Sequence, residues 1–144
     1  MNLNNKGFTL VELLAVVVIL SILLAFMYPN VNKLINENKE KNYEKLESSI
    51  KSAAKMYISD YRYKITVDGE NITSINDSLI TDSKVPVSIL VDEGNIETND
   101  EGKIENPKNK KECLNFDNSY VTVKYDSTKK DYNYSEPNLE WKSC

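Results

Sequence analysis

The chain has 144 residues, of which 40% are hydrophobic and 28% are charged, and its formal net charge is −4. It has no histidine and two cysteines, which excludes Ser-His-Asp and Cys-His catalysis and zinc sites that need His or more than two Cys. The acidic balance gives no reason to expect nucleic-acid binding. The hydrophobic residues are concentrated at 8–28, whereas 29–144 is rich in Asn, Lys and acidic residues. Such segregation is not typical of one uniform soluble domain.

The sequence predicts a membrane-spanning helix at 8–28, where nearly all side chains are apolar. At 1.5 Å per residue, this block would be roughly 32 Å long, which matches the hydrocarbon core of a bilayer. A cleaved secretory signal has a shorter apolar region and a small-residue exit site, whereas this block ends in residues 26–30, Phe-Met-Tyr-Pro-Asn. Lys6 is the only charge before the block and favours a cytoplasmic amino terminus, with the polar remainder outside.

Glu12 is the exceptional residue of this block, because a carboxylate at the centre of a bilayer costs about 2.5–3.5 kcal/mol on insertion scales. One interpretation is that Glu12 lies shallow enough to remain in contact with water. The other is that a partner charge neutralises it after assembly. A free amine would be such a partner if the chain were cut just before Phe8.

A family resemblance lies in residues 6–14, Lys-Gly-Phe-Thr-Leu-Val-Glu-Leu-Leu. This segment resembles the prepilin motif of type IV pilins and of type II secretion or competence pseudopilins. The resemblance implies that a prepilin peptidase cuts between Gly7 and Phe8, so that 1–7 is a leader, and that the same enzyme N-methylates the new Phe8 amine. It also implies that Glu12 pairs with the terminal amine of a neighbouring subunit during filament assembly.

The resemblance also implies a set of partners: other pilin subunits, the prepilin peptidase, the inner-membrane pilus assembly machinery, and the membrane itself before assembly. The favoured interpretation is the structural subunit of a type IV pilus, a cell-surface filament, with no enzymatic activity. One alternative is a pseudopilin of a type II secretion or competence (DNA-uptake) system. The other is an anchored extracellular binding module that does not assemble. The motif does not by itself separate pilin from pseudopilin.

The helical pattern continues beyond the apolar block. Pro29 is expected to kink the helix, although it could instead end the membrane helix, with Asn30 capping a new one. From residue 43 to residue 61, apolar residues recur every three or four positions, which predicts an amphipathic helix that packs on a head. We therefore expect one helix over about 8–61, of which 29–61 forms the amphipathic part.

Residues 62–144 are expected to form a globular, β-rich head, so the predicted fold class is α+β, with the long helix packed against a small antiparallel sheet. The alternation at 120–125 predicts a strand, and 131–134 is its expected antiparallel partner. Residues 63–67 and 71–75 fit a hairpin. Periodicity leaves 83–93 open between helix and buried strand, with Gly94 as a helix stop. The polar, Lys-rich residues 99–112 are expected to be a surface loop.

Cys113 and Cys144 both lie in the part predicted to be exported, where an even pair of cysteines favours a disulfide. Two free thiols are the alternative. The resemblance adds that type IV pilins often have a disulfide-bounded carboxy-terminal region. No cofactor and no metal site are expected, because the acidic residues lack the spacing of a calcium loop. The many Asn and Lys residues suggest an A+T-rich genome, as in low-GC Gram-positive bacteria.

Overall fold

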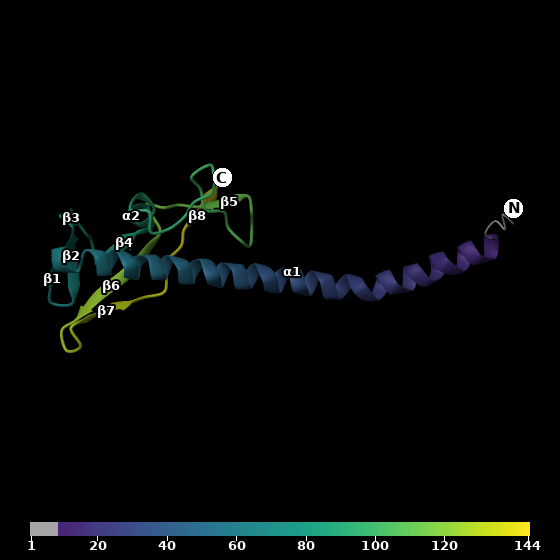
Figure 1. Ribbon diagram of the computed structural model, residues 1–144, viewed down its shortest axis with the longest axis horizontal. Coiled ribbons are helices and arrows are strands. Elements are labelled where there is room, and N and C mark those ends of the chain that lie inside the picture. Colours follow the sequence, from purple (N-terminus) through teal and green to yellow (C-terminus); the bar gives the residue numbers. More distant parts are fainter. Residues whose placement is uncertain (1–8) are drawn as a thin grey trace, which may run out of the picture. The chain divides into compact units, whose positions relative to one another are not determined.

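A computed structural model describes residues 9–144, although for 28–30 it describes the backbone alone. The predicted cleavage and methylation sites at Gly7 and Phe8 therefore lie outside the described residues. The chain divides into two compact units, with the boundary between Asn38 and Lys39. The helix α1, Leu10–Asp60, contributes to both units (Figure 1). It contains no glycine, and its backbone remains helical through 28–30.

The head combines the second part of α1 with antiparallel strands, which confirms the predicted α+β fold class. A 3-10 turn, Arg62–Lys64, follows α1. The strands and the second helix are, in chain order, β1 (Ile65–Asp68), β2 (Asn71–Ile75), β3 (Ser78–Leu79), β4 (Lys84–Pro86), α2 (Val87–Asp92), β5 (Glu112–Leu114), β6 (Tyr120–Asp126), β7 (Asp131–Tyr134) and β8 (Trp141–Ser143). One sheet has the order β1-β2-β6-β4, with β3 also paired to β2 and β7 to β6, and β5 pairs with β8 in a second sheet.

The core of the head forms where the apolar stripe of α1 meets one face of the larger sheet. The helix side chains that are almost completely buried are Ile50, Ala53, Ala54, Tyr57 and Ile58. From the sheet, the buried side chains are Ile72, Ile75, Val85, Val121 and Val123. The predicted helical stripe is therefore confirmed, and the predicted strand at 120–125 contributes Val121 and Val123 to the core. In contrast, α1 is exposed at residues 36–42, where the sequence lacks a stripe.

Most strand predictions are confirmed, and the structure resolves the segment that periodicity left open. The predicted hairpin is formed by β1 and β2, and β6 pairs with β7. Residues 83–93 contain both candidates, because β4 ends at Pro86 and α2 begins at the next residue. Gly94 follows α2 with a φ of 72°, the left-handed conformation typical of a helix stop.

The prediction of a surface loop at 99–112 is wrong in part. Ile104 is buried, and its carbonyl oxygen accepts a hydrogen bond of 2.9 Å from the Leu114 amide. Asn106 is also buried, and its side-chain amide donates to the Glu112 carboxylate at 2.8 Å. The segment folds back beside β5, so its polar groups are satisfied locally although the sequence is hydrophilic.

Candidate functional site

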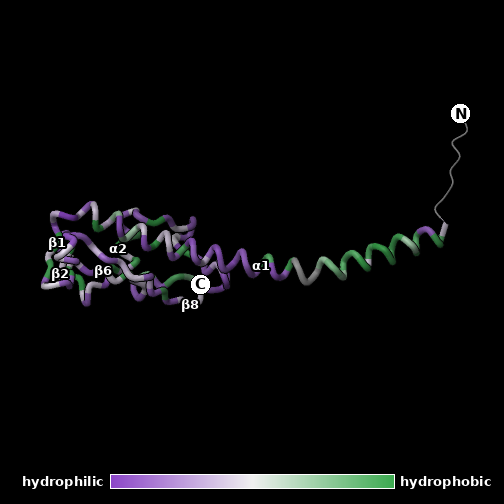
Figure 2. The backbone as a smooth tube through the Cα atoms, turned by 90° about the horizontal axis from the view of Figure 1, so that it is seen from below, coloured by the Kyte–Doolittle hydropathy of each residue, from purple (hydrophilic) through white to green (hydrophobic). Residues whose placement is uncertain are grey.

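The first candidate site is the apolar segment, which we define as residues 10–27 of α1. Its large apolar side chains are exposed on every side of the helix, from 48% at Leu23 to 82% at Leu10. Figure 2 shows this part of α1 as the hydrophobic stretch of the chain, and its mean hydropathy over an 18-residue window reaches 2.9. By length and composition, the helix could cross a membrane.

The hydroxyl inside the apolar segment is satisfied within the helix itself. The Ser21 hydroxyl donates to the Val17 carbonyl oxygen at 2.7 Å. Such an i to i−4 bond removes the desolvation penalty of a hydroxyl in an apolar medium. Beyond its first turn, the outer surface of the apolar segment is therefore apolar. Such a surface suits contact with lipid tails or with other apolar helices.

At the beginning of α1, Thr9 and Glu12 form a capping box. The Thr9 amide and the Thr9 hydroxyl each donate to Glu12 Oε2 at 2.8 Å, and the Glu12 amide donates to Thr9 Oγ1 at 3.3 Å. Two amides that have no partner in the first turn are thereby satisfied. The carboxylate is also held at the positive end of the helix dipole, and within residues 9–144 its Oε1 accepts no hydrogen bond.

The sequence reasoning identified Glu12 but missed the part played by Thr9. A signal was available, because Thr-x-x-Glu directly before an apolar run is the sequence pattern of a capping box. The backbone of α1 is helical at Pro29, but the structure does not describe the side chain of this residue. The kink at Pro29 therefore stays a prediction. Glu12 and the two cysteines lie in different units of the chain.

The second candidate site is the carboxy-terminal region, where Cys113 and Cys144 form a disulfide. Cys113 lies in β5, whose partner strand β8 directly precedes Cys144. The Cys144 amide donates to the Lys111 carbonyl oxygen at 3.0 Å. The last residue of the chain is therefore fixed by a covalent bond and a hydrogen bond.

This region is also fastened to α1. The Lys108 ammonium donates to the Glu40 carboxylate at 2.8 Å and lies 4.0 Å from the centroid of the Tyr43 ring. The hydrogen bond that Lys108 donates to the Glu40 carboxylate raises the pKa of Lys108. The rings of Tyr43 and Trp141 are 5.9 Å apart, so α1, the 99–112 segment and β8 meet at one point.

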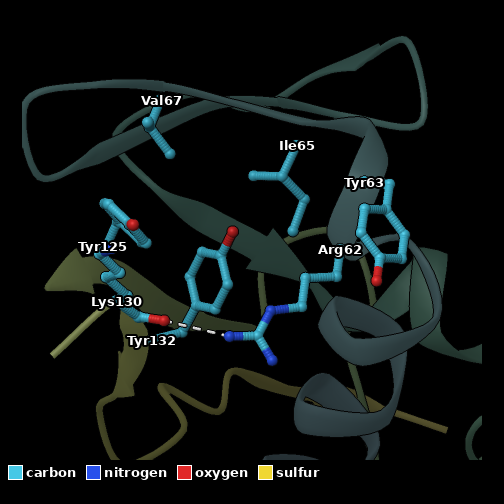
Figure 3. A pocket seen from close by; sticks show the side chains of 7 residues that line it. All are labelled: Arg62, Tyr63, Ile65, Val67, Tyr125, Lys130 and Tyr132. Atoms are coloured by element: carbon cyan, nitrogen blue, oxygen red, sulfur yellow. Dashed lines mark hydrogen bonds between the residues drawn. The ribbon is translucent and has the colours of Figure 1, made fainter. Parts of the chain in front are cut away.

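A third feature is a hollow of about 480 Å³ next to the carboxy-terminal end of α1, which we call the helix-end hollow (Figure 3). Its lining residues are Arg62, Tyr63, Ile65, Val67, Tyr125, Lys130 and Tyr132. Val123 is the last residue of β6 in the core. Tyr125, two positions later, lies on the same face of the strand and lines the hollow. Tyr132 is the cross-strand partner of Tyr125, and their rings lie 5.3 Å apart.

This hollow could not be predicted from the sequence, because Arg62 and Lys130 are 68 positions apart. The Arg62 guanidinium donates to the Lys130 carbonyl oxygen at 3.0 Å, which holds the turn after β6 against the end of α1. Burial raises the pKa of Tyr132 above its ordinary value. The lining contains two cations, three tyrosines and two aliphatic residues, with no carboxylate.

Comparison with known proteins gives one family match and two relatives. Residues 2–28 match the family model described as the prokaryotic N-terminal methylation motif. "Competence protein ComGC" of Bacillus subtilis is 41% identical over 59 residues, which are 41% of this chain and 60% of the relative. "ComG operon protein 3 homolog" of Bacillus licheniformis is 37% identical over 59 residues, again 41% of this chain, and 61% of the relative.

These matches cover the chain only in part. The chain spans about three-fifths of the length of the curated relatives that it matches. No solved structure matches the chain. The family match itself is confined to residues 2–28.

Proposed function

Because the chain carries the prepilin N-methylation motif and is distantly related to the Bacillus ComGC proteins, we propose that it is a competence-type pseudopilin, a non-enzymatic subunit of an envelope-spanning filament. In this proposal the leader 1–7 is removed between Gly7 and Phe8, and the Phe8 amine is methylated. The subunit is stored in the membrane through the apolar segment and is then transferred into the filament. The prepilin peptidase and the membrane-embedded assembly machinery are its processing and assembly partners.

One observation carries the proposal: α1 begins with a carboxylate held at its first turn and then exposes apolar side chains on all sides. A helix that is apolar all round needs either lipid or other helices around it. Within a helix bundle of low dielectric, an unpaired Glu12 carboxylate is penalised, and a cationic terminus on a neighbour removes the penalty. The lone acid would therefore select the register at which each subunit is added.

The type IV pilus of the first interpretation remains a second candidate, because the disulfide-bounded carboxy-terminal region is common in pilins. A pilus and a pseudopilus place the same helix in the same kind of bundle and differ in length and purpose. The similarity to competence proteins favours the pseudopilin and gives no support to an adhesive fimbria.

The intact mass and the amino-terminal residue of the native protein test the maturation. We expect a chain that begins at N-methylated Phe8, is lighter by the leader, and carries one disulfide. A membrane-bound protein that still begins at Met1 would contradict the proposal and favour an anchored module that does not assemble.

Deletion of the gene separates the two filament types. A competence pseudopilin should be required for DNA uptake, and its loss should remove no long surface fibres. Loss of long fibres visible by electron microscopy, with normal DNA uptake, would instead favour the pilus.

A further inference from the structure

The helix-end hollow has the composition of a protein-binding surface. Its aromatic and aliphatic residues sit beside two cations, and Tyr63 is fully exposed. Within residues 9–144, neither the Arg62 guanidinium nor the Lys130 ammonium forms an ion pair. Tyrosine and arginine are the residues most enriched where protein partners bind tightly, and unpaired cations favour a partner that carries carboxylates.

A surface of complementary chemistry lies on the same head, at the turn between β2 and β3 and in β3 itself. Leu79 in β3 is 88% exposed, the highest value for a large aliphatic side chain in the head. Asp77, two residues earlier, is exposed and forms no ion pair within the described part of the chain. We call Asp77 and Leu79 the β3 knob. It presents one apolar side chain and one free carboxylate.

The knob does not fill the hollow of its own chain. Strand β1, which contributes Ile65 and Val67 to the hollow, lies on one edge of β2, and β3 lies on the other edge. Because neighbouring strands are about 4.8 Å apart, β1 and β3 are separated by roughly 10 Å. Leu79 is also absent from the lining of the hollow. The two surfaces of one chain therefore remain available to other copies.

We propose that the β3 knob of one copy docks into the helix-end hollow of a second copy, an inference that rests on the proposed function. Leu79 packs against the apolar and aromatic lining, and Asp77 lies beside Arg62 and Lys130. Since the two surfaces differ, the contact is heterologous, and an open row of such contacts leaves a free knob at one end and a free hollow at the other. Where the rotation between neighbours does not close a ring, repetition of this contact builds an open filament, in agreement with the proposed function.

Site-specific cross-linking between full-length subunits tests the contact. Two tagged copies, one with Leu79→Cys and the other with Val67→Cys, are expressed together and oxidised after assembly. We expect a covalent dimer that contains both tags. A matched control pairs Leu79→Cys with Met56→Cys, because Met56 is also an exposed apolar residue of the head, at 57%, but lies outside the hollow. The control pair and two copies of Leu79→Cys should give no dimer above background.

The charged part of the contact is tested by Asp77→Asn and Lys130→Gln in the cross-linking pair. Asn tolerates the φ of 65° at position 77, so this change removes the charge without straining the turn. Each change alone should lower the dimer yield by about two- to fivefold at low salt, and the double variant should lower it no further. Losses that multiply in the double variant would show that Asp77 and Lys130 do not meet.

The failures of the two proposals are distinguishable. Filaments that form normally, with no Leu79→Cys and Val67→Cys dimer, would overturn the docking contact and leave the proposed function intact. Native protein that forms no filament and keeps its leader would overturn the proposed function and the contact with it.

Discussion

Two side chains at the start of α1 connect local structure to assembly. The side chains of Thr9 and Glu12 each accept a hydrogen bond from the backbone amide of the other residue. The Glu12 carboxylate, which lies in an otherwise apolar segment, is therefore also part of the helix cap. In the membrane, this cap reduces the cost of the charged group by supplying two hydrogen bonds to it. In the proposed filament, the same carboxylate faces the amine of a neighbour, and Oε1 is the atom left for it.

Glu12→Val should leave membrane insertion intact, because it removes the costly group of the apolar segment. Incorporation into filaments should fall at least tenfold, about 1.4 kcal/mol, because no carboxylate remains for the neighbouring amine. Quantification of sheared filaments against membrane-bound subunit measures both effects. Leu13→Val serves as the control, and normal filament yield from Glu12→Val would rule out the pairing role.

Thr9→Val keeps the shape of the side chain and removes the hydroxyl of the cap. It should destabilise the first turn of α1 by about 0.5–2 kcal/mol, the usual value of an N-cap, while Thr9→Ser should be close to the original. Amide hydrogen exchange of the first turn, in detergent-solubilised full chain, reports the difference. Equal protection in the Val and Ser variants would contradict the capping box.

The helix α1 changes its surface along its length, and each part has a different partner. In the apolar segment, side chains on every face are exposed, whereas from Ile50 onward one face is buried in the head. The difference follows from the spacing of apolar residues, which is continuous in the first part and every three or four positions in the second. The second part of this one helix forms the core of the head, and the proposed function assigns assembly to the first part.

Ile58→Ala should lower the free energy of unfolding of the head by about 2–5 kcal/mol, because Ile58 is 1% exposed and its loss leaves a cavity. Met56→Ala, on the exposed side of the same helix, should change it by no more than about 0.5 kcal/mol. Urea unfolding followed by the fluorescence of the single tryptophan, Trp141, measures both variants. Similar losses in the two variants would mean that the stripe does not form the core.

Tyr134 in β7 gives the head a dependence on alkaline pH. Burial, with a smaller contribution from Asp131, raises the pKa of Tyr134 to about 12. Between about pH 10, where the unfolded tyrosine ionises, and pH 12, the unfolded chain binds fewer protons than the folded chain, so stability falls as the pH rises. In Tyr134→Phe, the free energy of unfolding, measured with urea over this range, should fall less steeply with pH. An unchanged slope would assign the effect to other groups.

In the chain as a whole, the disulfide is the long-range covalent constraint on the head. Its sequence separation is 31 residues, and it encloses β5, β6, β7 and β8. The same region is fastened to α1 by the contacts of Lys108 with Glu40 and of Trp141 with Tyr43. The carboxy-terminal third of the chain is therefore tied to the helix through β8.

Replacement of both Cys113 and Cys144 by Ser should lower the free energy of unfolding by about 3–4 kcal/mol in the chain-entropy model for a loop of this length. Reducing agent should have the same effect on the original chain and none on the double variant. Thermal unfolding with and without reductant measures the loss. A double variant as stable as the original would show that the loop needs no covalent closure.

Much of the molecule follows from local patterns. The apolar run, the three- and four-residue spacing after residue 43 and the alternation at 120–125 each reflect a single element, and the structure confirms these elements. The buried Ile104 and Asn106 could not be predicted in this way. Their burial depends on the fold-back beside β5, which no local pattern in the hydrophilic segment announces.

By itself, the sequence determined the prepilin motif, the long helix with one carboxylate in its apolar segment, and the α+β class, because each depends on neighbours within a few positions or on regular spacing. Only the tertiary structure decided which strands and turns lie beside the end of α1, and thereby brought Arg62, Lys130 and the tyrosines into one hollow. The physical reason is that the hollow is formed by residues far apart in the chain, and their meeting depends on strand pairing and helix length together.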